Sequence, residues 1–118
     1  MELRLKILSA ALIVGAAACG SSGAYSTGPG GGTPPPNTVE ALSSLAFNPS
    51  SLTVATGTAV TFTFQGVTHN VTFTAATGVP ADIGDTMNAS VQRTFTTAGT
   101  FSYHCTIHPQ MTGTIVVQ

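Results

Sequence analysis

Charged side chains are scarce in this chain of 118 residues. Asp, Glu, Lys and Arg make up 6% of it, and three bases stand against four acids for a net charge of −1. Because the bases form no patch, the electrostatic footprint of a nucleic-acid-binding protein is absent, and we expect no nucleic-acid partner. A surface with so little charge also steers partners weakly, so docking of a protein partner would depend on apolar contacts.

Hydrophobic runs long enough to cross a membrane as a helix are lacking too. The longest, residues 7–18, is well short of the roughly 20 apolar residues that a bilayer requires. It follows a basic start and ends in three alanines before Cys19, which is typical of a bacterial export signal over residues 1–19. The alanines and Cys19 resemble a lipoprotein signal-peptidase site. We therefore expect export to the periplasm or cell envelope, with a lipid on Cys19; the alternative is ordinary cleavage near Ala18.

Cysteines are few, since Cys19 and Cys105 are the only two. An exported chain with two cysteines would ordinarily be expected to form one disulfide. If Cys19 carries a lipid, however, Cys105 is left unpaired. A lone thiol in an oxidising compartment is prone to react unless a metal holds it as a bound thiolate. The alternative is a buried and inert cysteine.

Residues 20–38 contain almost no apolar side chains and are rich in Gly, Ser, Thr and Pro. Such a segment cannot contribute to a core, so we expect a disordered tether that is stiffer at the proline run Pro34–Pro36. Behind a lipid anchor, this tether would let a small carrier move between membrane-bound partners. The globular domain is then residues 39–118.

Helical periodicity is absent beyond the export signal. Instead, short alternations of apolar and polar residues, rich in Thr, Val and Phe, are separated by turn residues. The predicted strands are 42–47, 52–54, 60–64, 69–74, a stretch around 78–80, 91–95, 100–105 and 113–117. Seven to eight short strands with regular turn signals predict an all-β protein, a two-sheet antiparallel β-sandwich. Residues 75–88 have the weakest pattern and are expected to run over its surface.

Cys105, His108 and Met111 follow one another at three-residue intervals. A soft thiolate and a thioether suit Cu(I), and imidazole suits either oxidation state of copper. Two His, one Cys and a weak axial Met form the site of electron-transfer copper proteins. The spacing therefore predicts a copper site that still lacks one ligand.

The missing ligand has two candidates, because His69 and His104 are the only other histidines. Alternation along a strand puts His104 on the face opposite Cys105, whereas His69 shares a face with the apolar Val71 and Phe73. His69 is thus the predicted fourth ligand. It lies far from Cys105 in the sequence, so the site can form only when the whole fold closes.

Other candidate ligands have weaker support. Met87 is a further thioether, but no spacing connects it to the others, and we expect it in the core. Asp82 and Asp85 lack the full oxygen set of a calcium loop and are expected in a solvated loop. His104 is expected on the surface of a strand; a second copper cluster, as in multicopper oxidases, would need more than the three histidines present.

The segment Tyr103–Gly113 resembles the C-terminal ligand loop of plastocyanins and especially amicyanins, and His69–Phe73 is similar to their segment around the first histidine ligand. The resemblance extends from about Leu45 to the last residue. It implies a Greek-key cupredoxin sandwich with one type 1 copper ion and with His108 as the electron port in an apolar patch. There are two departures from the family pattern. Phe62-Thr63-Phe64 replaces a Trp-x-Asn pattern, so the Asn that braces the loop is expected to be missing, and Ile107 stands where proline is common.

These observations predict an electron-transfer protein that cycles one copper between Cu(II) and Cu(I) and is not an enzyme. Its metal ligands would be His69, Cys105, His108 and Met111, its partners redox proteins associated with a membrane, and its state monomeric. The alternative is a periplasmic protein that stores or delivers copper with the same ligands. A small enzyme or sensor using the Cys-His pair would need an open coordination position, against which Met111 argues.

Overall fold

The computed structural model describes residues 33–118. The predicted export signal, the lipid site at Cys19 and most of the predicted tether lie outside this range. Among the described residues, no helix has the length and apolar character needed to cross a membrane.

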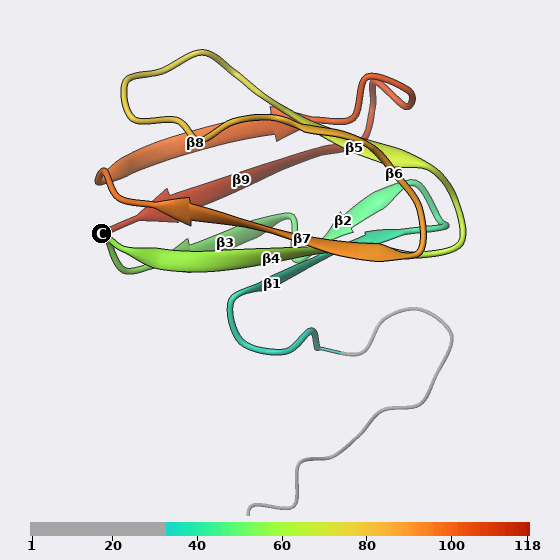
Figure 1. The fold of residues 1–118 in the computed structure, drawn as a ribbon, viewed down its shortest axis with the longest axis horizontal. Helices are drawn as coiled ribbons and strands as arrows, with labels where there is room; N and C mark the ends of the chain where they lie inside the picture. Colours follow the sequence, from blue (N-terminus) through green and yellow to red (C-terminus); the bar gives the residue numbers. More distant parts are fainter. Residues whose placement is uncertain (1–32) are drawn as a thin grey trace, which may run out of the picture.

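All regular structure in this range is β-strand. The strands are β1 (Thr38–Leu42), β2 (Ala46–Asn48), β3 (Ser51–Val54), β4 (Thr58–Phe64), β5 (His69–Phe73), β6 (Ile83–Thr86), β7 (Ala89–Phe95), β8 (Gly99–His104) and β9 (Thr112–Val117). They form one sheet in the order β2-β1-β4-β7 and a second in the order β3-β9-β8-β5-β6. Figure 1 shows the resulting layers, with β8, β9 and β5 above β4, β7 and β1. The predicted all-β two-sheet sandwich is confirmed.

The sheets differ from the prediction in two pairings, because β1 with β4 and β3 with β9 are parallel. A short hairpin can join only antiparallel strands, so parallel neighbours need a longer connection. Here the chain leaves β1, passes through the β2 hairpin and the β3 strand of the other sheet, and returns as β4. Local strand patterns do not reveal such a return, so the prediction of a purely antiparallel sandwich was wrong in this detail.

Three predicted segments also differ. The predicted strand 42–47 is a hairpin, since the Leu45 N–H donates to the Leu42 carbonyl (3.0 Å) and Leu45 has a φ of 64°. Residues 78–80 form a turn at Gly78, whose φ is 81°, rather than a strand. The weakly patterned segment contains β6, in which Gly84 and Asp85, residue types that strands disfavour, interrupt the pattern between Ile83 and Thr86. Residues 33–118 therefore contain nine strands rather than seven to eight.

Aromatic side chains fill the space between the sheets. Tyr103 is 2% exposed, and its ring contacts Phe62 and Phe73 edge-on, at centroid distances of 5.5 Å and 5.8 Å. Each such pair contributes roughly 0.5–1.5 kcal/mol beyond the burial of its area. Tyr103 of β8 pairs with Gly113 of β9, and a Cβ on residue 113 would overlap the tyrosine ring. Gly113 is thus required for close packing at the point where β9 begins.

The connection between β5 and β6 is held against the opposite sheet by Arg93 of β7. Its guanidinium donates to the carbonyls of Ala81 (2.7 Å) and Asp82 (2.8 Å), while the Asp82 carboxylate accepts the Phe73 N–H (2.8 Å). Asp82 is exposed in the loop before β6, as expected, and its carboxylate also ties that loop to β5. Met87, expected in the core, is 52% exposed, because it lies in the turn between β6 and β7, where Asn88 has a φ of 52°.

Candidate metal centre

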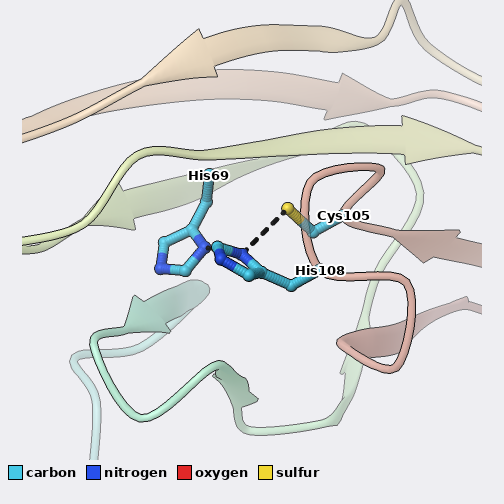
Figure 2. Close-up of side chains that lie close together, drawn as sticks. All are labelled: His69, Cys105 and His108. Carbon is cyan, nitrogen blue, oxygen red and sulfur yellow. Dashed lines mark hydrogen bonds between the residues drawn. The ribbon is translucent and has the colours of Figure 1, made fainter.

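Three of the four predicted ligands come together at one end of the sandwich. His69 begins β5, Cys105 follows β8, and His108 lies in the loop before β9. Their ligand atoms all lie within 4.8 Å of one another. The two Nδ1 atoms are 3.2 Å apart, and the Cys105 Sγ is 3.7 Å from the His108 Nδ1. Figure 2 shows both rings and the sulfur directed at one another.

His69 is fully buried, and both of its ring nitrogens have defined neighbours. Its Nε2 lies 3.0 Å from the Leu42 carbonyl, which can only accept, so Nε2 carries the hydrogen and Nδ1 presents its lone pair to the other ligands. Burial is the main cause that lowers the pKa of His69, with a smaller contribution from His108, and the bond to Leu42 opposes them. The ring is thereby kept neutral, which is the form that binds a metal.

The ligand loop is closed at its neck by backbone hydrogen bonds. The Cys105 N–H donates to the Met111 carbonyl (2.9 Å), and the Met111 N–H donates to the His108 carbonyl (2.8 Å). Cys105 is fully buried, Met111 is 2% exposed and His108 is half-buried. The three-residue spacing of the ligands thus corresponds to one tight, internally bonded turn with Met111 buried at its base.

Asn70 holds this loop against β5. Its Oδ1 accepts the Thr106 N–H (2.8 Å), its Nδ2 donates to the Thr106 hydroxyl (2.6 Å), and its backbone N–H lies 3.5 Å from the Cys105 sulfur. An N–H donated to a ligand sulfur draws electron density from it, as contacts behind the ligands generally do. The expectation that no Asn braces the ligand loop was therefore wrong. The residue stands directly after the first histidine rather than at Phe64.

Strand register explains why Asn70 was missed. Alternation predicts it on the outer, polar face of β5, yet it is 6% exposed. Thr72 pairs with His104 in antiparallel register, and continuing that register by two residues brings Asn70 beside Thr106. The ligand loop therefore covers the outer face of β5 at this point. A polar residue directly after a predicted histidine ligand is the only sequence signal for it.

The remaining candidates lie apart from the cluster. His104 is the last residue of β8, where it pairs with Thr72 and Thr112, and its side chain is half-buried. Among the described residues, the cluster of possible metal ligands contains His69, Cys105 and His108 but not His104. Asp85 is exposed but accepts a hydrogen bond from Asn70 (3.0 Å). It is therefore more than the solvated loop residue that was expected.

The donor set fits copper. The Cys105 thiol and the His69 and His108 imidazoles converge from β5 and from the ligand loop, and His69 and Cys105 are fully buried. The Met111 thioether is buried in the same loop. Thiolate and thioether sulfur favour Cu(I), and imidazole accommodates Cu(II) as well.

Comparison with known proteins agrees with this chemistry. A family model described as copper binding proteins, plastocyanin/azurin family, matches residues 37–118. The chain is 33% identical over 81 residues to amicyanin-alpha of Methylorubrum extorquens, covering 65% of this chain and 68% of that protein. It is 33% identical over 89 residues to plastocyanin of the fern Dryopteris crassirhizoma, covering 61% of this chain and 87% of that protein.

Solved structures resemble the fold as well. An oxidised amicyanin variant superposes with a TM-score of 0.62 at 32% identity, covering 69% of this chain and 80% of that chain. A copper-containing nitrite reductase from Thermus scotoductus gives a TM-score of 0.61 at 29% identity. That match covers 72% of this chain but only 23% of the reductase, so most of the enzyme has no counterpart here.

Proposed function

Because the chain belongs to the plastocyanin/azurin family of copper-binding proteins, we propose that His69, Cys105, His108 and Met111 hold its type 1 copper and that it passes single electrons between redox partner proteins. The observation that carries this proposal is the convergence of the His69, Cys105 and His108 ligand atoms within 4.8 Å. His69 begins β5, Cys105 directly follows β8, and both are fully buried.

When bound, copper supplies the one-electron couple between Cu(II) and Cu(I). The protein's contribution is a frame that is already assembled. Leu42 fixes the His69 ring, Asn70 fixes the ligand loop, and the backbone bonds of Met111 close that loop. Because these groups are held by hydrogen bonds of the fold rather than by the metal, a change of oxidation state requires little rearrangement of the ligands.

Electron exchange with a partner takes place at His108. It is the half-buried member of the cluster, so its ring can reach the surface, while Ile107 beside it is 43% exposed and Pro109 is exposed. Leu45 adds a further apolar side chain that is 46% exposed. It lies in the hairpin turn just after Leu42, whose carbonyl contacts His69. With few charges nearby, apolar contact around His108 is the basis for docking.

The protein acts as a carrier and not as an enzyme in this proposal. The nitrite reductase that it resembles has most of its chain outside the match. A fourth ligand at Met111 would leave no open coordination position for a substrate. Export, lipidation of Cys19, a membrane-associated partner and a monomeric state complete the proposal. Export and lipidation rest on the sequence of residues 1–38, and docking through apolar contacts rests on the small number of charges.

The test is the visible absorption of the purified protein after addition of Cu(II), followed by several cycles of reduction and reoxidation. An intense thiolate-to-copper band that disappears on reduction and returns in full is the expected result. Cys105→Ser should fold but show no such band, because a hydroxyl does not supply the soft thiolate. An equally intense band in Cys105→Ser would remove Cys105 from the site. Loss of copper to a Cu(I) chelator within one cycle would instead favour storage or delivery.

A further inference from the structure

β6 carries a bulge directly beside the candidate metal centre. In the pairing of β5 with β6, His69 faces Thr86 and Val71 faces Ile83, so Asn70 alone stands opposite both Gly84 and Asp85. An extra residue in one strand bends it and redirects a side chain, and bulges are frequent next to functional sites. Here the bulge brings the Asp85 carboxylate to the Asn70 side chain, with 3.0 Å between Oδ1 and Nδ2.

The Asn70 side chain is held at each of its polar positions. Its carbonyl oxygen accepts the Thr106 N–H, one amide hydrogen goes to the Thr106 hydroxyl, and the other goes to Asp85. A carboxylate can only accept, so only the NH₂ end of the amide can face Asp85. The Thr106 hydroxyl can donate or accept and therefore cannot select between the two orientations of the amide. The Thr106 N–H, which can only donate, and the Asp85 carboxylate, which can only accept, select the same orientation from opposite ends of the amide, because a flipped amide would place its oxygen against the carboxylate and its NH₂ against the N–H.

We propose that Asp85 is a positioning residue for the copper site: together with the Thr106 N–H it fixes the orientation of the Asn70 amide, and through Asn70 it steadies the ligand loop and the N–H that faces the Cys105 sulfur. The proposal rests on the ligand set given above for its consequence at copper. Its structural part, the hold on Asn70, applies to the protein without metal as well.

The effect comes from an oriented acceptor more than from charge. Asp85 is exposed, so water and salt screen its negative charge from the metal centre. The hydrogen bond it accepts is short-range and directional, and it leads to a side chain that is 6% exposed. Replacing the carboxylate by a neutral acceptor should therefore preserve most of its role, whereas removing the acceptor should abolish it.

Three variants of the full chain separate these contributions. Asp85→Ala removes charge and acceptor, and Asp85→Asn removes charge but keeps an acceptor oxygen. Asp82→Asn is the matched control, because it removes the same charge near β6 from a carboxylate that bonds to Phe73 and not to Asn70. The first readout is hydrogen exchange of the Asn70 side-chain amide, measured by NMR in the metal-free protein. The second is the position of the thiolate-to-copper band after addition of Cu(II).

Asp85→Ala should speed exchange of the Asn70 amide hydrogens by up to roughly tenfold, the loss expected for one ordinary hydrogen bond. It should also displace the copper band. Asp85→Asn should restore slow exchange and the wild-type band, and Asp82→Asn should match the wild type in both. Unchanged exchange in Asp85→Ala, equal exchange in the two Asp85 variants, or an equal effect of Asp82→Asn would each overturn the proposal. Absence of any copper band in the wild type would refute the proposed function instead, and the exchange result would stand by itself.

Discussion

Tyr103 should make this protein sensitive to alkali, and its replacement by Phe should remove that sensitivity. The Tyr103 hydroxyl is buried and has no hydrogen-bond partner among the described residues, and burial raises the pKa of Tyr103 above its usual value of 10.0. In the unfolded chain the phenol titrates near that usual value. Above pH 10 the unfolded state therefore binds fewer protons than the folded state, and stability falls as pH rises.

The size of the effect follows from linkage. Each pH unit between the unfolded and the folded pKa reduces the free energy of unfolding by about 1.4 kcal/mol. Moving from pH 8 to pH 11 should therefore destabilise the metal-free wild type by about 1.4 kcal/mol more than Tyr103→Phe. At pH 8 the variant should be as stable as the wild type or slightly more so, because Phe keeps the ring contacts and leaves no unpartnered hydroxyl in the core.

Urea unfolding of both proteins at the two pH values is the appropriate measurement. All other contributions of pH are common to the two proteins and cancel in the difference between them. Parallel stability profiles for wild type and Tyr103→Phe would refute the reasoning, since they would show that the phenol ionises equally easily in both states. A large loss of stability in the variant at pH 8 would show that the hydroxyl has a partner after all.

The remaining predictions concern the loop and the anchor. Gly113→Ala should reduce the free energy of unfolding by about 1–3 kcal/mol, because the added Cβ overlaps the Tyr103 ring. Urea unfolding of the metal-free protein measures this loss, and an unchanged urea midpoint would contradict the close packing of Gly113 against Tyr103. Met111→Gln should keep coloured copper but lower the reduction potential in voltammetry, since an oxygen donor favours Cu(II); an unchanged potential would exclude Met111 as the axial ligand. Cys19→Ser should move the protein from the membrane fraction to the soluble envelope fraction, and unchanged fractionation would exclude lipidation at Cys19.

The sequence by itself determined what depends on short-range pattern. The spacing of Cys105, His108 and Met111 identifies copper chemistry within seven residues, and the two-residue period of a strand distinguishes His69 from His104. Thr- and Val-rich alternations between turn residues are equally local, and they predict the β-sandwich. The structure brings His69 to Cys105 and His108 as that period requires.

The tertiary structure decided everything that depends on which segments lie against each other. Asn70 becomes a buried brace only because strand register lays the ligand loop over the outer face of β5. Asp85 reaches Asn70 only through the bulge in β6. Met87 is apolar but exposed, because it lies in the turn between β6 and β7. A hydrogen bond between residues far apart in sequence forms only when the fold brings them together. No local sequence pattern therefore predicts it.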